Sequence, residues 1–342
     1  MKASGLRGIC PSRLRAASMR RIWTVIVLAV ACGASPPAWS KSASLWVADG
    51  KNNRVVELSP THLKKSGSPT PIVLDGVLSH DRGLAFDKSQ NLWVCNTGDH
   101  TVLEFTPTQL KNLGTVSNPT PTATIGSTDF VGLVAAFLDA GGNLWLIDEG
   151  NSVHELSKTQ LNAGSNANIT PAVTITSAAD FDGPHFGTFD KSGNLWVSSE
   201  FNNMVVEFNS SQLGSGGDKT PNVVLSPNGS SLSEPGQLAF DHKGNLWVAN
   251  YGNNTVVMFA EGDLSASGMP IPKVTLSTST FNGPWGLALD AGKNLWISNW
   301  NVGVIMKISS KKLKKSGAPT PSVTLTSVID NAADQITFGP VF

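Results

Sequence analysis

The sequence has few cysteines and few charges, and each scarcity argues against a class of protein. Two of its 3 Cys, Cys10 and Cys32, fall near the N-terminus, so no intrachain disulfide framework can form. Charged residues make up only 15% of the chain, and 25 Lys and Arg balance 25 Asp and Glu, which gives no sign of a nucleic-acid surface. The chain also lacks Gly-x-Ser-x-Gly, His-Glu-x-x-His and a phosphate-binding loop, so none of the enzyme classes that these motifs mark is indicated.

The N-terminus has the pattern of an export signal. An apolar run at 22–31 follows Met19-Arg20-Arg21, and no acidic residue precedes Lys41. Such a run is too short to anchor a mature chain across a bilayer, but it is typical of a secretory signal peptide, of ordinary length if translation starts at Met19. We therefore predict that residues 1–40 are a signal peptide and that the remaining chain is extracytoplasmic, either periplasmic or secreted.

Two cleavage sites remain open. Ala38-Trp39-Ser40 has the small residues that ordinary cleavage before Lys41 requires. Ala29-Val30-Ala31-Cys32 instead resembles a bacterial lipoprotein box, in which Cys32 would be lipidated and the protein held at the outer membrane. In either case the exported chain differs in charge from the whole, because residues 41–342 hold 19 basic and 25 acidic residues, a formal charge of −6.

A repeat of about 50 residues organises the rest of the chain. The dipeptide Leu-Trp recurs with its tryptophan at Trp46, Trp93, Trp145, Trp196, Trp247 and Trp296, at spacings of 47, 52, 51, 51 and 49. Repeats of this length mark solenoids and propellers. Six of the 10 Trp are therefore repeat positions, and we expect them to pack between the repeats.

One repeat predicts four short strands, at 236–240, 246–249, 255–259 and 273–276. Short strands bounded by Gly, Asn and Asp at even spacing indicate a closed all-β array. Four strands in each of six repeats predict a six-bladed β-propeller with four-stranded blades. The alternatives, a parallel β-helix or a β-sandwich, would have shorter repeats or less regular spacing.

The two ends of the chain predict how the ring closes. The first repeat begins at 44–46 without the innermost strand that precedes every other Leu-Trp, and residues 334–339 align with residues 82–87. The C-terminal strand should therefore join the first blade and remove the open edge. Residues 41–342 are then a single propeller domain. The connections at 106–110, 157–161 and 310–313 predict capped helical turns on the face opposite the pocket.

The repeated pattern Asp-x-x-Gly-Asn-Leu-Trp-Val-Ala-Asn, followed by Asn-x-Val-Val-x-Phe, resembles NHL-repeat propellers over residues 44–342. More distantly, it is similar to the gluconolactonase/luciferin-regenerating-type and virginiamycin B lyase propellers. The resemblance implies a site at the mouth of the central channel, on a scaffold that hosts lactonases, lyases and non-catalytic binders. We expect an exported ligand-binding or protein-interaction module. The alternative is a secreted hydrolase or lyase, lactonase-like or streptogramin lyase-like, with its site at this mouth.

Aligning the repeats predicts which residues surround the channel mouth. One position per blade gives Arg82, Val134, His185, Gly236, Trp285 and Asp334, and the adjacent position adds Gln237 and Gln335. The turns after the second strands should open on the same face, with Asp49, Asn53, Asp99, His100, Asp148, Glu149, Glu200, Asn202, Asn203, Tyr251, Asn253, Trp300 and Asn301.

These residues predict a binding site. Arg82, His185, Trp285 and Asp334 should bind a small polar or anionic ligand, with Trp285 as a stacking face and Gln237 and Gln335 beside them. The alternative is that Arg82 and Asp334 only form a surface ion pair.

Few of these residues suit catalysis or a metal. His185 is the one candidate for a catalytic base, although no Glu-x-His element accompanies it. Gluconolactonase-like proteins hold a divalent cation with Glu, Asn and Asp at the mouth, whereas here only Asp334 fits and Arg82 opposes a cation. We therefore predict no metal and no cofactor; a divalent cation belongs only to the enzyme alternative.

The remaining expectations concern partners and surface. We expect a monomer that binds a small polar ligand or a protein, binds no nucleic acid, and meets a membrane only through a lipid on Cys32. Cys95 should be a small core residue. The basic clusters at 64–65 and 311–315 are expected to be solvated, on connections that the closure could bring side by side.

Overall fold

A computed structural model describes residues 43–114, 119–329 and 332–342. The predicted signal peptide and Cys32 lie outside these ranges, so both assignments stay predictions. Within them, no helix is long and apolar enough to cross a membrane.

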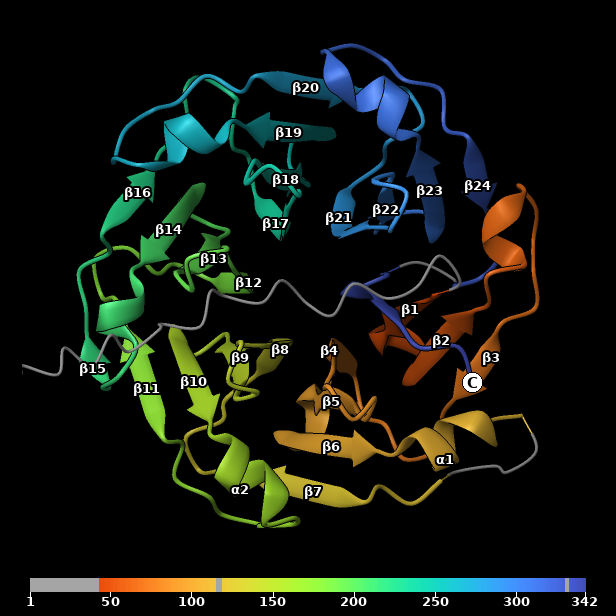
Figure 1. The fold of residues 1–342 in the computed structure, drawn as a ribbon, viewed down its shortest axis with the longest axis vertical. Coiled ribbons are helices and arrows are strands. Elements are labelled where there is room, and N and C mark those ends of the chain that lie inside the picture. The colour runs from red at the N-terminus through yellow and green to blue at the C-terminus, as the bar shows by residue number, and fades with distance from the viewer. Residues whose placement is uncertain (1–42, 115–118, 330–331) are drawn as a thin grey trace, which may run out of the picture. The chain divides into compact units, whose positions relative to one another are not determined.

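Six antiparallel sheets form blades around a ring (Figure 1). Blade 1 runs outward through β25 (Ile336–Gly339), β1 (Ser44–Asp49), β2 (Arg54–Leu58) and β3 (Ile72–Leu74). Blade 2 has β4 (Asp81–Phe86), β5 (Leu92–Asn96), β6 (Thr101–Phe105) and β7 (Ala123–Gly126). Blade 3 has β8 (Leu133–Leu138), β9 (Leu144–Asp148), β10 (Ser152–Leu156) and β11 (Val173–Thr176).

The second half of the chain repeats this order. Blade 4 has β12 (Pro184–Phe189), β13 (Leu195–Ser199), β14 (Met204–Phe208) and β16 (Val223–Leu225). Blade 5 has β17 (Pro235–Phe240), β18 (Leu246–Asn250), β19 (Thr255–Phe259) and β20 (Val274–Ser277). Blade 6 has β21 (Pro284–Leu289), β22 (Leu295–Asn299), β23 (Val304–Ile308) and β24 (Val323–Leu325). The predicted six-bladed propeller with four-stranded blades is confirmed.

The C-terminal strand closes the ring as predicted. β25 pairs antiparallel with β1, with Leu45 opposite Phe338 and Val47 opposite Ile336. Further along, Ala48 donates to the carbonyl of Gln335 and accepts from the N–H of Asp334, both at 3.0 Å. The first blade is therefore built from both ends of the described chain, and the inner edge of β1 is paired.

The repeated Asp shapes the turn between the first two strands of a blade. In blade 2, Oδ1 of Asp87 accepts the backbone N–H of Asn91 at 2.9 Å, and Oδ2 accepts the indole N–H of Trp93 at 3.3 Å. The same bonds recur at Asp139, Asp190 and Asp290. The Asp-x-x-x-Asn-x-Trp spacing therefore encodes a turn that also orients the tryptophan.

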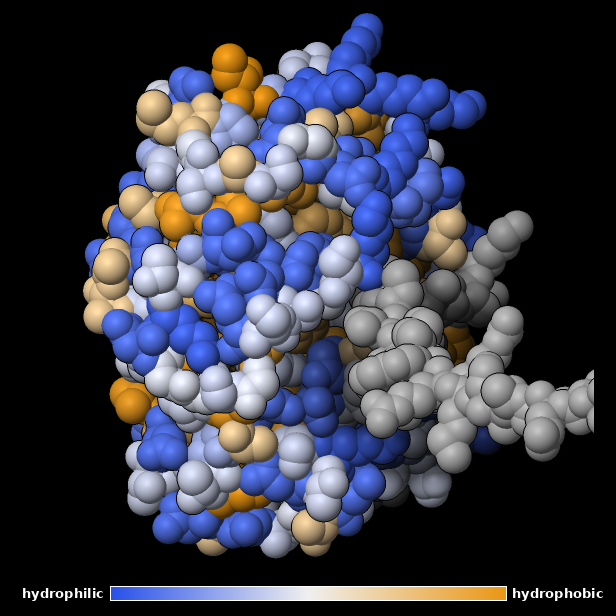
Figure 2. Space-filling view, turned by 60° about the vertical axis from the view of Figure 1, so that its left-hand side comes forward, coloured by the Kyte–Doolittle hydropathy of each residue, from blue (hydrophilic) through white to orange (hydrophobic). Residues whose placement is uncertain are grey.

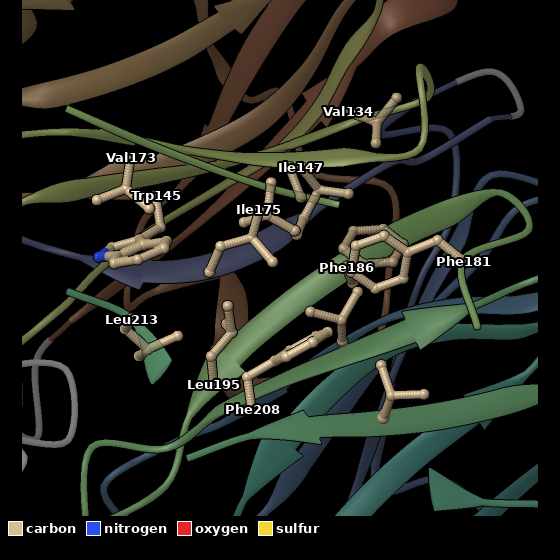
Figure 3. Close-up of a cluster of buried hydrophobic side chains, with 14 of the residues drawn as sticks. Val134, Trp145, Ile147, Val173, Ile175, Phe181, Phe186, Leu195, Phe208 and Leu213 are labelled. Carbon is tan, nitrogen blue, oxygen red and sulfur yellow. The ribbon is translucent and has the colours of Figure 1, made fainter. Parts of the chain in front are cut away.

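Each repeat tryptophan packs into the core that its blade shares with the next blade. Six clusters of buried side chains fill the six junctions, and Figure 3 shows the cluster between blades 3 and 4. In four junctions the indole meets a phenylalanine from the inner strand of the following blade, as Trp46 meets Phe86 with ring centroids 5.3 Å apart. The predicted packing role of the tryptophans is confirmed, and Cys95 is a buried core residue.

Short helical turns connect the third and fourth strands. They are η2 (His62–Lys64), α1 (Pro107–Lys111), α2 (Lys158–Asn162), η4 (Ser210–Gln212), η5 (Glu261–Leu264) and η6 (Ser310–Lys314); η1 (Gly50–Asn52) and η3 (Thr97–Asp99) follow second strands instead. Capping boxes begin α1 and α2, as predicted, and also η4. The cap predicted for the turn at 310–313 is wrong, because Ser309 makes no side-chain cap bond to η6. The helical turns bond to the Asp turns, for example Ser310 N–H to Asn294 Oδ1 at 2.9 Å, so they share one face of the ring. We call it the helical-turn face.

The outer edges of the blades are tied to one another. Before its own fourth strand, the chain of one blade pairs in parallel with the outer strand of the preceding blade. β15 (Gly217–Asp218) does so with β11, and the same contact joins Gly67 to Leu325 and Gly317 to Leu276. On the side that Figure 2 shows, the outer surface is mostly hydrophilic with scattered apolar residues.

A matched pair of tryptophans tests the Asp–indole bond. Trp145 and Trp247 are equally buried, but only Trp145 donates to its turn aspartate. We expect Trp145→Phe to lower the free energy of unfolding by about 1–2 kcal/mol more than Trp247→Phe, because both lose similar volume and only the first loses a bond to a carboxylate. Urea unfolding of both variants measures the difference; equal losses would contradict a stabilising role for the bond.

Candidate functional site

The predicted channel-mouth positions lie where each inner strand begins. In blades 2 to 6 the pairing of the first two strands shifts register there, for instance between Asp81 and Leu84. Such a bulge interrupts the regular ladder and re-aims side chains. We call this face, opposite the helical turns, the mouth face.

Arg82 is the centre of a buried polar cluster at the mouth. Its Nε donates to Asp334 Oδ1 at 3.1 Å, its Nη1 donates to Glu149, and its Nη2 lies 2.5 Å from His185 Nε2. Nδ1 of His185 in turn lies 3.0 Å from Glu200 Oε2. Arg82, His185 and Asp334, which come from three different blades, are therefore brought together. The ion pair of Arg82 with Asp334 is buried, so the expected surface ion pair is corrected.

The contacts of His185 determine the tautomer of its imidazole ring. Because the guanidinium can only donate, Nε2 must accept from Arg82, and the ring proton must sit on Nδ1 and point to Glu200. Burial and then the positive charge of Arg82 lower the pKa of His185 well below its usual value. The imidazole is neutral and its lone pair is already used, so His185 cannot serve as a base while this contact with Arg82 holds.

Aromatic side chains form the other half of the mouth. Trp285 meets His185, Tyr251 and Trp300 edge to face, with ring centroids 4.6, 5.6 and 5.9 Å apart. A Cβ at Gly236 would lie 2.9 Å from the Trp285 ring, so glycine at this channel-mouth position leaves room for the indole. Trp285 is only 4% exposed and supports the site from below, whereas half-buried Trp300 presents its ring at the surface.

A cavity of about 440 Å³ opens at the mouth. Its walls are Lys51, His80, Arg82, Trp300, Ala332 and Asp334. Among the described residues, Asp334 Oδ2 has no hydrogen-bond partner although the side chain is almost fully buried. The same holds for both carboxylate oxygens of the neighbouring Asp81. The mouth therefore holds three buried carboxyl oxygens without a partner among the described residues, against one such donor, the indole N–H of Trp285.

Burial gives these two carboxyls unusual proton affinities. Burial, with a smaller contribution from the charge of Asp334, raises the pKa of Asp81 to about 8. Burial raises the pKa of Asp334 to about 7, against the opposing effect of Arg82. Asp81 is therefore largely protonated at neutral pH, and the cluster carries less negative charge than its composition suggests.

Gln237 and Gln335 lie deeper and bond to backbone. Oε1 of Gln335 accepts from the N–H groups of Leu84 and Ala136 at 3.0 and 3.2 Å, and its Nε2 donates to the carbonyl of Ala136. Gln237 forms the same arrangement with Leu287 and Ile336. Each amide links the inner strands of three blades. Both side chains use these polar atoms inside the protein, so we do not include them in the proposed site.

The turn residues expected at the mouth divide into two groups. Glu149, Glu200, Tyr251 and Trp300 occupy the same repeat position and contact the inner-ring residues described above. Others hold the fold: Asp148 accepts the N–H groups of Val131, Gly132 and Gly150, and Asn53 and Asn203 accept N–H groups from the following blade. Val134 is a buried core residue. The repeat alignment missed Asp81, since no feature of the sequence shows that it is buried without a partner.

A second cavity, of about 1160 Å³, lies at the helical-turn face. Leu84, Phe137, Phe189, Phe240 and Phe338 are among its walls, with Gln237 and Gln335 also lining it. In the parts of the chain that the structure describes, no group of three or more His, Cys, Asp or Glu is arranged to hold a metal ion.

Comparison with known proteins supports the fold only. No family model and no curated protein matches the sequence, so NHL remains a resemblance in sequence pattern. A chain of a nidogen/laminin complex matches with TM-score 0.61 and 13% identity, over 87% of this chain and 98% of that chain. A protein of unknown function from Bacteroides caccae matches with TM-score 0.59 and 13% identity, over 88% and 100%.

An enzyme is also among the similar structures. Virginiamycin B lyase from Staphylococcus aureus matches with TM-score 0.54 and 12% identity, over 90% of this chain and 98% of that chain. The propeller architecture is thus shared with a lyase and with a chain from a complex of two proteins. At such identities the likeness says nothing about the residues at the mouth.

The buried carboxyl of Asp81 predicts a pH-dependent stability. The unfolded carboxyl loses its proton near pH 4, while the folded one keeps it up to about pH 8, so rising pH lowers the free energy of unfolding across this window. We expect Asp81→Asn to reduce this slope and to be more stable than wild type by a few kcal/mol at pH 8.5, since one pKa unit corresponds to about 1.4 kcal/mol.

Urea unfolding at pH 4 and pH 8.5 measures this effect. The exposed Asp75 supplies the control, and Asp75→Asn should leave the pH profile unchanged. If Asp81→Asn parallels wild type at every pH, the carboxyl is not protonated in the folded state.

Proposed function

We propose that this chain is an exported propeller that acts as a binding module and takes a small polar ligand at the mouth face. The observation that carries the proposal is the cavity beside Arg82 and Asp334, where a buried carboxylate oxygen faces no donor from the described residues. An unpaired buried acceptor costs about 1–3 kcal/mol, and a ligand that donates to it would recover that cost. The signal peptide predicted at residues 1–40 supports a function outside the cytoplasm.

The chemistry of the walls favours a ligand rich in hydrogen-bond donors. Arg82 directs three of its five N–H groups at Asp334, Glu149 and His185, and its two carboxyl partners offset its charge, so it attracts an anion less than a free guanidinium would. Trp300 adds an aromatic surface at the same mouth. A carboxylate beside a tryptophan suits a hydroxyl-bearing ring or an amine, so the anionic ligand considered from the sequence is the less favoured choice.

The site supports binding better than catalysis. His185, the candidate base, has both ring nitrogens engaged, and its low pKa leaves it a poor proton acceptor. A hydrolase or lyase would have to separate His185 from Arg82 first. Turnover of a ligand would therefore count against the proposal as stated.

Calorimetric titration with a panel of neutral saccharides and primary amines tests the proposal. We expect at least one member to bind, and Trp300→Ala and Asp334→Asn each to weaken it at least tenfold, because they remove the aromatic surface and the charged acceptor. Phe201→Ala is the matched control: Phe201 is 66% exposed near Gly183 on the same face, yet it does not line the cavity.

Three results would count against this function. They are a panel in which nothing binds, a ligand whose affinity survives both substitutions, and a ligand that the purified protein converts to product. Thermal melts of each variant show whether a lost signal reflects the site or the fold.

A further inference from the structure

The lysines of blades 6 and 1 are concentrated on one connection in each blade. The motif Leu-Lys-Lys-Ser-Gly occurs at 63–67 and again at 313–317, and Lys311 and Lys312 precede the second copy. The equivalent positions in blades 2 to 5 read Leu110-Lys111-Asn112, Leu161-Asn162-Ala163, Leu213-Gly214-Ser215 and Leu264-Ser265-Ala266. We call Lys64, Lys65, Lys311, Lys312, Lys314 and Lys315 the lysine rim.

Ring closure brings the two copies, which are 250 residues apart in sequence, to adjacent blades. Ser66 Oγ accepts the backbone N–H of Thr324 at 3.0 Å, and Gly67 pairs with Leu325 of β24. Ser316 Oγ accepts the N–H of Thr275 in the same way. The blue turn η6 and the orange turn η2 consequently lie on either side of β24 in Figure 1. The lysine pairs next to these serines are thus held at neighbouring junctions.

The lysine rim is exposed positive charge with no acidic residue on its own two connections. All six side chains are exposed, and among the described residues none of them forms an ion pair. The segments 59–71 and 309–322 contain no Asp or Glu. The acidic residues on the corresponding connections, Asp218, Glu261 and Asp263, belong to blades 4 and 5.

Screening decides which charge an approaching surface meets. The exported chain has a formal charge of −6, which would repel an anionic surface if it acted as a whole. At about 0.15 M salt, exposed charges farther apart than about 8 Å are largely screened from one another. A surface that touches the lysine rim therefore meets the six lysines and not the acids of the far blades.

We propose that the lysine rim is a docking surface for anionic phospholipid headgroups. Ala43, the first described residue, directly precedes β1 of blade 1, the blade whose connection carries Lys64 and Lys65. If Cys32 carries a lipid, ten residues separate it from Ala43, and one acyl chain needs a second signal such as a basic patch for stable attachment. Cleavage before Lys41 would instead leave an α-amino group and one more lysine two residues before Ala43.

Vesicle co-sedimentation tests the proposal with the chain 41–342, which contains all six inter-blade cores and so the complete ring. We expect binding to vesicles of about 30% phosphatidylglycerol in phosphatidylcholine at low salt, release at about 0.5 M salt, and no binding to pure phosphatidylcholine. K64Q/K65Q/K314Q/K315Q should lower the partition coefficient at least tenfold.

The control removes the same number of positive charges from lysines outside the lysine rim. K88Q/K243Q/K273Q/K293Q alters four exposed lysines outside the rim and should change partitioning less than twofold. Replacing the four rim lysines by arginine should retain binding, which separates charge from folding. Equal losses in both quadruple glutamine variants, binding to neutral vesicles, or binding to soluble polyphosphate without binding to vesicles would each overturn the proposal. None of these outcomes involves the cavity at the mouth face, so the vesicle experiment does not test the proposed ligand site.

Discussion

The structure depends on the joint between one blade and the next. A four-stranded sheet cannot bury its two faces alone, so each blade needs the indole of one neighbour and the inner strand of the other. The turn aspartate holds that indole in place in four of the blades, and a phenylalanine of the following blade meets it in four of the junctions. A joint repeated at nearly constant spacing sets a nearly constant angle between blades, and the ring follows from it.

Ring closure also assembles the mouth. Asp334 and Gln335 come from the C-terminal segment, yet they contact Arg82, Leu84 and Ala136 of the second and third blades. The buried ion pair and the Gln335 links exist only when the last strand has joined the first blade. The site is thus coupled to the completion of the fold, and it cannot form on a partial ring.

The ring could be predicted from the sequence because equivalent positions in the six repeats occupy equivalent structural environments, so each position is observed several times. Aligning on the closing aspartate placed Arg82, His185 and Asp334 correctly, since the inner strands of blades 2 to 6 all have six residues and the segment 334–339 follows the same pattern. It could not predict that Trp285 lies beneath Trp300, or that Gln237 and Gln335 bond to backbone. Those outcomes depend on side-chain directions at the bulge and on depth, neither of which a repeat position encodes. For the same reason, the sequence could not predict that Asp81 is buried with no hydrogen-bond partner for its carboxyl oxygens among the described residues.

The antiparallel pairing of β1 with β25 has a mechanical consequence. Ser44 lies opposite Gly339, so both described ends of the chain leave the ring at the same end of one strand pair. A force that pulls these ends apart would load the hydrogen bonds of that pair one after another, as in a zipper, and would not shear them together. The blade that closes the ring is therefore its weakest point under tension, while the other five blades, each continuous in sequence, carry no such load until it has opened.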